Sequence, residues 1–241
     1  MMDAYFLDLD GTLIFSHRYF HDGYMPVESY KESIISYIEK GTYTKLVETI
    51  ARGGFIPVTS RTKEQYSRIA IFNEHCPHYA LLDNGGTLLI DGKEDSDWRK
   101  ATESLLSGSF EPMYKIVSWA SQYADVKVQD GIVIFIKTDK EQLREIIIEG
   151  LKEYPDFYWF LHRSKLYVCS RKLTKGAGVR RLIDKYGFRH CVGAGDGDVD
   201  FSMIEYVDKF VTNEANKDKI SSEKVIVVSE REVARVALNM K

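Results

Sequence analysis

Short, unbroken apolar runs that alternate with amphipathic segments are the feature that most constrains the fold of this chain. Such runs occur in AYFLDLD, FIPVTS, HCVGAGD, KFVTN and KVIVVS. A strand that is apolar throughout must be buried on both faces, as in a parallel sheet that is covered by helices on both sides. We therefore predict an α/β fold whose core is a Rossmann-like parallel sheet.

The segments between these strands predict the helices of the core. Helical spacing and terminal glycines indicate helices within residues 43–54, 62–76 and 175–187, and a last helix within 230–241. Residues 15–38 contain Gly, Pro and alternating polar and apolar residues, so we expect a loop or hairpin excursion there.

Residues 85–171 have a different pattern from the rest of the chain. A helical segment precedes a predicted hairpin about an Asp-Gly turn, and an amphipathic helix precedes a second hairpin, FYWFLHR–KLYVCSR. This α-β-β-α-β-β order predicts helices packed on one antiparallel sheet. The module is therefore an α+β insertion into the parallel-sheet core.

Composition excludes several classes of protein. Lys and Arg number 33 against 36 Asp and Glu, so the net charge of −3 provides no basic surface for nucleic acid. No apolar run reaches the roughly 18 residues of a membrane span. Cys76, Cys169 and Cys191 lack metal-ligand spacing and are expected to be reduced core thiols. With no apolar leader before the first strand, we expect a cytoplasmic protein.

Polar side chains follow the predicted strands at the point where each strand ends. In open α/β sheets, ligands bind outside the carboxyl ends of the strands. Eight residues lie at these ends: Asp8, Asp10, Thr59, Ser60, Arg61, Asp196, Asp198 and Asp200. Lys175 opens the helix predicted within residues 175–187, immediately before the third of these strands.

This set of side chains has the chemistry of phosphoryl transfer. Clustered carboxylates raise each other's pKa unless a cation or a lysine compensates, and an oxygen-only ligand set suits Mg²⁺. A carboxylate can also act as a nucleophile and form an acyl phosphate. A hydroxyl, a lysine and backbone N–H groups can together bind the outer oxygens of a phosphoryl group.

Four motifs of this chain resemble, in this order, those of the haloacid dehalogenase-like phosphohydrolases. They are DLDGTL, VTSR, the lysine at the start of a helix, and GDGDVD. The insertion resembles the cap of subclass IIB, which includes Cof-type and sugar-phosphate phosphatases, sucrose-phosphate phosphatases and phosphomannomutases. The resemblance implies a catalytic core of residues 1–84 and 172–241 and a cap domain of residues 85–171.

The resemblance assigns the acidic residues. Asp8 would attack phosphorus, and Asp10 would protonate the leaving oxygen and then activate water. Mg²⁺ would be held by Asp8, Asp196 and the backbone carbonyl of Asp10, with Asp200 supporting the metal. The subclass usually has asparagine where this chain has Val199, so metal affinity is expected to differ.

The same resemblance assigns the phosphate-binding residues. Thr59 and Lys175 would bind phosphoryl oxygens, with help from backbone N–H groups near Asp10 and Ser60. Asp198 could compensate for Val199, but an exposed turn residue is the favoured interpretation.

Four residues are candidate substrate contacts, and for Asn213 the absence of a role is the favoured interpretation. They are Asn84 in a glycine turn, His162 and Arg163 in the turn of the second hairpin, and Asn213 after a strand. A plain hinge turn accounts equally well for Asn84, and a solvated turn for His162 and Arg163.

The function implied is a Mg²⁺-dependent phosphatase that acts on a small phosphorylated metabolite, with a sugar phosphate as the expected example. A phosphomutase on the same scaffold is the first alternative, although it needs a cationic cluster on the cap. A non-catalytic metabolite-binding protein is the second, and Val199 is its support. No nucleic-acid or membrane partner is expected, and the sequence does not predict the oligomeric state or the substrate.

Overall fold

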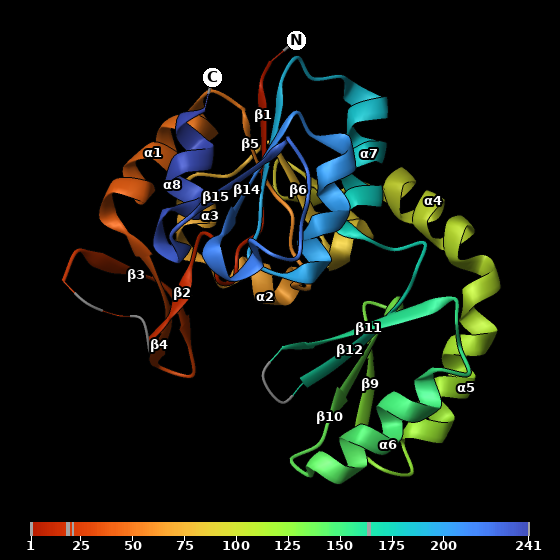
Figure 1. Cartoon of the computed structure of the whole chain (residues 1–241). Coiled ribbons are helices and arrows are strands. Elements are labelled where there is room, and N and C mark those ends of the chain that lie inside the picture. Colours follow the sequence, from red (N-terminus) through yellow and green to blue (C-terminus); the bar gives the residue numbers. More distant parts are fainter. Residues whose placement is uncertain (1, 18–19, 21, 163–164, 241) are drawn as a thin grey trace. The chain divides into compact units, whose positions relative to one another are not determined.

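The computed structural model describes residues 2–17, 20, 22–162 and 165–240 (Figure 1). The chain divides into two compact units, Met1–Asp95 with Thr174–Lys241, and Ser96–Leu173. The predicted first junction lay at residues 84/85. Residues 85–95 instead lie in the first unit, because β7 (Thr87–Ile90) pairs along its length with β6 (Tyr79–Leu82).

A five-stranded parallel sheet forms the centre of the first unit and confirms the α/β prediction. Its order is β15 (Val225–Val228), β14 (Lys209–Asn213), β13 (Cys191–Ala194), β1 (Ala4–Leu7) and β5 (Phe55–Pro57), and each neighbouring pair is parallel. In β1, Leu7 lies opposite Ala194 on one side and Pro57 on the other. The carboxyl ends of these strands therefore meet at one edge.

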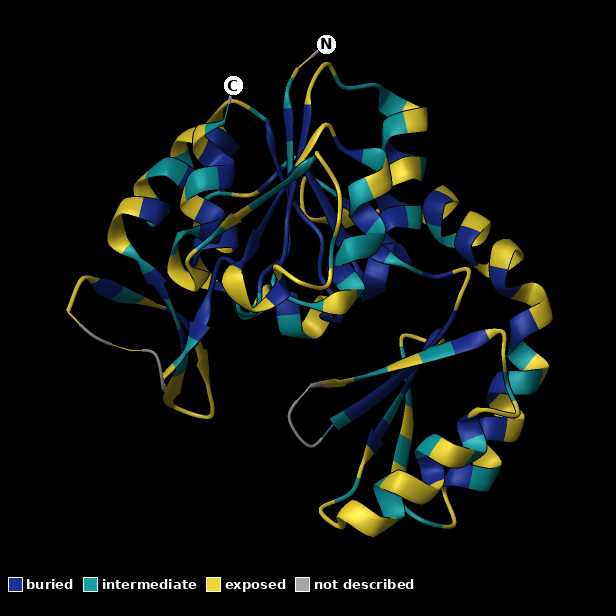
Figure 2. Cartoon of the chain, viewed as in Figure 1, coloured by how far each residue is buried: buried dark blue, intermediate teal, exposed yellow. Residues whose placement is uncertain are grey.

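The two faces of this sheet bury different side chains. Leu7 belongs to the core cluster that includes residues of α1 (Lys40–Ala51) and α8 (Val233–Asn239), which contact each other. Its neighbour Phe6 points to the opposite face, as strand alternation requires. The ring of Phe6 packs edge to face with that of Phe188, and the two ring centroids are 5.8 Å apart. Phe188 follows α7 (Lys175–Tyr186), which lies across the sheet from α1 and α8 (Figure 1). Figure 2 shows the central strands as buried.

The predicted excursion after the first strand is a small antiparallel sheet. Its order is β2 (Phe15–Ser16), β4 (Ser33–Glu39) and β3 (Tyr24–Tyr30). The predicted continuous helix over residues 62–76 is wrong. It is divided into α2 (Lys63–Ser67) and α3 (Ala70–Glu74), because Ile69 between them makes a β-bridge with Glu28 of β3.

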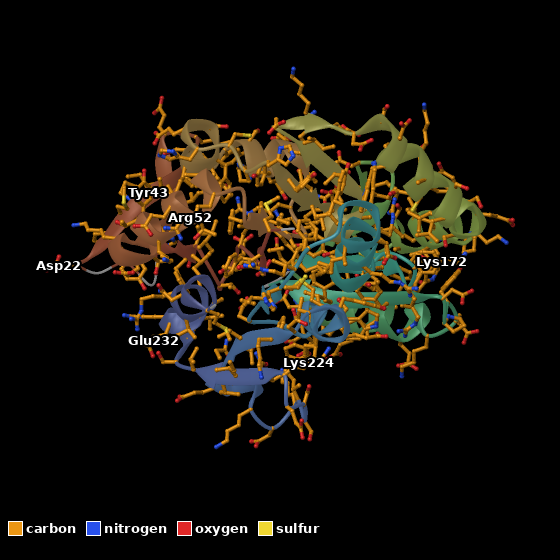
Figure 3. All side chains as sticks on the ribbon, turned by 90° about the horizontal axis from the view of Figure 1, so that it is seen from above. Asp22, Tyr43, Arg52, Lys172, Lys224 and Glu232 are labelled. Atoms are coloured by element: carbon orange, nitrogen blue, oxygen red, sulfur yellow. The ribbon has the colours of Figure 1, made fainter. Side chains whose placement is uncertain are left out.

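Short elements connect the parallel sheet to its surroundings. The turn Asp83–Gly85 joins β6 to β7 and packs against α7 so closely that a Cβ on Gly178 would lie 2.6 Å from the Cα of Gly85. Lys224, labelled in Figure 3, donates from Nζ to the carbonyl of Glu205 at 3.2 Å, which ties a 3₁₀ segment to the start of β15. The remaining short elements are β8 (Lys93–Glu94) and the 3₁₀ segments Asp198–Tyr206, Glu214–Asn216 and Glu230–Glu232.

The second unit packs helices on one antiparallel sheet. The strands lie in the order β11 (Phe157–His162), β12 (Lys165–Ser170), β10 (Val133–Lys137) and β9 (Asp125–Gln129). The helices α5 (Phe110–Ala120) and α6 (Glu141–Leu151) bury the apolar face of this sheet. The turn between β9 and β10 uses positive φ at Asp130 (45°) and Gly131 (73°), as the Asp-Gly pair predicts. The unit also contains α4 (Ser96–Leu106) and the 3₁₀ turn Ser107–Ser109.

Within the described part of the chain, no helix combines the length and apolar character that a membrane crossing requires.

Glu39 caps α1, and this cap predicts a pH-dependent contribution to stability. Its carboxylate accepts from the N–H of Gly41 at 2.8 Å and from the N–H of Thr42 at 2.6 Å. Burial acts to raise the pKa of Glu39, but these hydrogen bonds outweigh it and hold the pKa below its ordinary value of 4.5. The contribution is therefore present above that value and is lost as the pH falls through the lowered one.

We expect Glu39→Ala to lower the free energy of unfolding by about 1 kcal/mol at neutral pH, and the difference from the native protein to shrink as the pH falls below the ordinary glutamate pKa. Urea denaturation across this pH range measures the difference. Glu48→Ala on the same helix is the control, because Glu48 pairs with Lys45 at 3.4 Å and is half exposed. The same pH dependence in both variants would contradict the role of the cap.

Candidate active site

The loop after β1 places two carboxylates at the edge of the parallel sheet. The N–H of Asp8 donates to the carbonyl of Ala194 at 2.9 Å, so the β1–β13 pairing extends to this residue. The chain then turns, and Gly11 adopts a φ of +86° where a Cβ would lie 2.3 Å from Oδ2 of Asp196. Only glycine meets both conditions without displacing that aspartate.

Lys175 joins two buried carboxylates. Its Nζ lies 2.5 Å from Oδ1 of Asp8 and 2.5 Å from Oδ1 of Asp200. The lysine is the first residue of α7, whose N-cap is Thr174, and it is 2% exposed. An ammonium group this deeply buried is stable because both carboxylates contact it directly.

A third carboxylate completes the cluster. One ligand oxygen each of Asp8, Asp196 and Asp200 lies within 4.8 Å of the others. Asp196 accepts from Oγ1 of Thr12 at 3.0 Å, and Oδ2 of Asp200 accepts from the N–H of Gly197 at 2.9 Å. These bonds fix the orientation of both carboxylates before any ligand binds.

The cluster carries more negative charge than its lysine neutralises. Burial raises the pKa of Asp8 well above its ordinary value; Lys175 opposes this, and the neighbouring aspartates add to it. Burial and the charge of Asp200 raise the pKa of Asp196 to about 6. For Lys175, burial acts to lower the pKa, but the charges of Asp200 and Asp8 raise it above the ordinary lysine value. The lysine therefore stays charged.

The donor set fits a hard divalent cation. All three clustered side chains offer carboxylate oxygens, with no sulfur or imidazole among them. Mg²⁺ prefers such ligands, and a dication would offset the repulsion that raises the carboxyl pKa values. The side chain of Asp10 is not part of this cluster among the described residues, and a metal contact from its backbone carbonyl stays a prediction.

Asp10 instead pairs with Arg61. The guanidinium donates from Nε to Oδ2 at 2.7 Å and from Nη2 to Oδ1 at 2.8 Å. Arg61 follows β5 and is buried, whereas the Asp10 side chain is 35% exposed. Burial acts to lower the pKa of Arg61, but its bonds to Asp10 and to Glu28 raise it above the ordinary value.

Thr59 and Ser60 follow β5, at the same edge of the sheet as Asp8. The N–H of Val58 donates to the carbonyl of Leu7 at 2.8 Å, which aligns the end of β5 with the end of β1. Thr59 is fully buried, and its Oγ1 accepts from the N–H of Arg61 at 3.1 Å. A hydroxyl that accepts one bond still has its proton to donate to a phosphoryl oxygen.

Two residues of the last motif lie away from the cluster. Asp198 is exposed and pairs with Lys219 at 2.9 Å, as the favoured interpretation of the sequence expects. Val199 is half-buried, and its carbonyl accepts from Oγ of Ser202 at 2.9 Å. Val199 thus contributes to the backbone of the 3₁₀ segment that carries Asp200.

The predicted substrate contacts are placed as follows. Asn84 is buried in the turn after β6, with φ of 55°, and its N–H donates to the carbonyl of Thr59 at 3.0 Å. Asn213 ends β14, and its Oδ1 accepts from the N–H of Ala215 at 3.1 Å. His162 is the last residue of β11, in the second unit, and Arg163 lies outside the described residues.

Three residues with a direct part in this arrangement received no role from the sequence. Arg61 was visible at a strand end, but nothing in its spacing revealed the contact with Asp10. Glu28 lies in the excursion and has no motif around it. Asn216 donates from Nδ2 to the carbonyl of Asp196 at 2.8 Å, and only the fold brings these two residues together.

Residues 62–232 match the family model of the haloacid dehalogenase-like hydrolases. The chain belongs to this family. The matched range covers well over half of the chain and begins after Asp8 and Asp10, so it supports the relationship independently of the first motif. No curated protein matches this hydrolase.

Solved structures share the fold of the hydrolase along almost its whole length. A sucrose-phosphatase from Synechocystis, in complex with sucrose and phosphate, is 14% identical with a TM-score of 0.66, over 96% of this chain and 95% of that one. A trehalose-6-phosphate phosphatase related protein is 18% identical with a TM-score of 0.59, over 98% and 95%. A haloacid dehalogenase-like hydrolase from B. subtilis is 14% identical with a TM-score of 0.65, over the full length of both chains.

The charge of the cluster predicts that the site destabilises the metal-free hydrolase. Because the pKa of Asp196 is raised in the folded state, its contribution to stability is present at low pH and is lost as the pH rises through about 6. We therefore expect Asp196→Asn to raise the melting temperature in EDTA at pH 7.5. Removal of a repulsion on the order of 1 kcal/mol corresponds to a rise of a few degrees.

Mg²⁺ should stabilise the native protein more than this variant, because the variant lacks one carboxylate ligand. Thermal denaturation with and without Mg²⁺ measures both effects. Asp198→Asn, a change at an exposed carboxylate in the same segment, should leave the melting temperature unchanged. A lower melting temperature for Asp196→Asn in EDTA would contradict the predicted repulsion.

Proposed function

We propose that this hydrolase is a Mg²⁺-dependent phosphatase that acts on a small phosphorylated metabolite through an aspartyl-phosphate on Asp8. The observation that carries the proposal is the position of Lys175 between Asp8 and Asp200, at the edge where the parallel strands end. Membership of the hydrolase family makes water the expected acceptor.

In the first half of the reaction, an oxygen of Asp8 attacks phosphorus and the bond between phosphorus and the leaving oxygen breaks. Asp10 donates its proton to that oxygen, which leaves as an alcohol. Lys175 and Thr59, with backbone N–H groups near Asp10 and Ser60, bind the phosphoryl oxygens as their negative charge redistributes.

In the second half, Asp10 accepts a proton from water as the water oxygen attacks phosphorus. The bond between phosphorus and Asp8 breaks, inorganic phosphate forms, and both carboxyl groups return to their starting states. Mg²⁺, held by Asp8, Asp196 and the carbonyl of Asp10 with Asp200 in support, would neutralise phosphoryl charge. The 35% exposure of Asp10 supports its assignment to exchange protons with substrate and water.

A sugar phosphate is the proposed substrate class. Support comes from structures of the same fold that are described as a sucrose-phosphatase and as a sugar phosphatase of subclass IIB. We propose that the first unit is the catalytic core and the second the substrate-selecting cap, with Asn84, Asn213, His162 and Arg163 as candidate contacts. A cytoplasmic location stays a prediction.

The test is phosphate release from a panel of phosphorylated metabolites, with Mg²⁺ and with EDTA. We expect Mg²⁺-dependent release that Asp8→Asn lowers by at least about 10³-fold, because an amide cannot act as the carboxylate nucleophile. Asp198→Asn is the matched control and should retain turnover, since this side chain is exposed and pairs with Lys219.

The other outcomes separate the alternative functions. Interconversion of sugar phosphates that depends on a bisphosphate, without net phosphate release, would indicate a phosphomutase. Binding of a metabolite with no turnover, unchanged in Asp8→Asn, would indicate a non-catalytic binding protein. Either result overturns the proposed phosphatase.

A further inference from the structure

Glu28 is a buried carboxylate that the proposed reaction does not use. Its side chain is 0% exposed. Oε1 accepts from Nη1 of Arg61 at 2.9 Å and from Nε of Arg68 at 3.3 Å. Oε2 accepts from Nη2 of Arg61 at 2.9 Å and from Oγ of Ser36 at 2.7 Å. A carboxylate at this depth persists only because charged partners and hydrogen bonds surround it.

An irregularity in β3 turns Glu28 inward. Val27 and Glu28 are consecutive and both buried, although successive side chains of a regular strand point to opposite faces. The β3–β4 register shifts between Pro26 and Glu28 and again between Glu28 and Ser29. Such shifts re-aim a side chain. The β-bridge between Glu28 and Ile69 then fixes β3 against the segment that follows Arg61.

Arg61 lies between two carboxylates and uses its whole fork of donors. Nε and Nη2 bind Asp10, Nη1 and Nη2 bind Glu28, and Nη1 also donates to the carbonyl of Gln65 at 3.3 Å. The guanidinium is planar, so bidentate contact with Glu28 sets the plane in which it meets Asp10. The orientation of Asp10 therefore depends on a residue in a different sheet.

We propose that Glu28 is a positioning residue for Asp10, which it orients through Arg61. The inference rests on the proposed function, because it assumes that Asp10 transfers the proton. Without Glu28, Arg61 regains the rotamer freedom of a long side chain, and its guanidinium no longer meets the partly exposed Asp10 in a fixed orientation. Proton transfer requires correct placement, and a misplacement of about 1 Å can cost on the order of 10²-fold in rate.

The dependence of kcat/KM on the leaving group distinguishes a misplaced proton donor from a general structural defect, which would lower both values alike. An alkyl oxygen leaves poorly without a proton, whereas p-nitrophenolate leaves readily as the anion. The value of kcat/KM covers the steps up to departure of the leaving group, so it reports the proton donor for alkyl phosphates and is less sensitive to the donor for p-nitrophenyl phosphate.

The experiment compares the native protein with Glu28→Gln on p-nitrophenyl phosphate and on one alkyl phosphate that the native protein hydrolyses. We expect kcat/KM for the alkyl phosphate to fall by at least about tenfold more than kcat/KM for p-nitrophenyl phosphate. Glu64→Gln is the matched control: Glu64 also lies beside Arg68, at 3.9 Å, but its side chain is 85% exposed, and both activities should be unchanged.

Ser36→Ala keeps the proposal testable if Glu28→Gln does not fold. This change removes one hydrogen bond to Glu28 and keeps all charges, so it should shift the leaving-group preference in the same direction by a smaller factor. Circular dichroism and thermal denaturation establish that each variant is folded. The double variant Arg61→Lys with Glu28→Gln should have nearly the same leaving-group preference as Arg61→Lys alone. The reason is that the path through Arg61 is already lost in the single variant.

The outcomes separate this inference from the proposed function. Hydrolysis of both substrates by the native protein, with equal losses or no loss in the folded Glu28 or Ser36 variant, overturns the role of Glu28 and leaves the phosphatase intact. Failure of the native protein to release phosphate from any compound overturns both. An independent, additive effect of Glu28→Gln in the Arg61→Lys protein would also overturn positioning through Arg61.

Discussion

The contact of one ammonium group with two buried carboxylates is the interaction on which the rest of the site depends. Lys175 begins a helix, Asp8 directly follows a strand and Asp200 lies in a 3₁₀ segment, so this contact joins three parts of the chain at one edge of the sheet. Without the lysine, the carboxylates would be buried like charges and would have to take up protons. With it, the cluster stays charged enough to attract a hard cation and close enough to hold one. Structural stability and ligand affinity therefore act against each other here.

Asp8 and Asp10 lie two positions apart, yet each has a different cation. Asp8 pairs with a compact ammonium inside the protein, and the partly exposed Asp10 pairs with the planar guanidinium of the buried Arg61. An ammonium acts as a point charge that tolerates movement of its partner, whereas a guanidinium fixes a plane. This difference suits a nucleophile that must reach a phosphorus atom and a proton carrier that must keep its direction. The chain turns immediately after Asp10, where Gly11 has a φ of +86°.

The parallel sheet and its acidic edge were predictable because both depend on local pattern. Apolar runs determine which strands are buried, and the carboxyl ends of parallel strands meet whatever the loops do. Contacts that arise from the register of distant elements were not predictable. Glu28 is buried through a shift in β3, and its bridge to Ile69 divides a segment whose own spacing is helical. Asn216 reaches the carbonyl of Asp196 only because β13 and β14 are neighbours. Sequence spacing carries no signal for such pairs, since each partner looks ordinary in its own segment.

The order of the strands has a consequence for how the protein is made. Strand β1 leaves the ribosome before the other four strands of its sheet, but it pairs on one side with β13, whose residues follow the whole of the second unit. Translation adds about 5–20 residues per second, so β1 and β5 are exposed for on the order of ten seconds before β13 is synthesised. The second unit is contiguous in sequence, so it can fold during the wait, while an apolar strand edge of the first unit stays open. Nascent chains at this stage are the ones that chaperones would have to protect from aggregation.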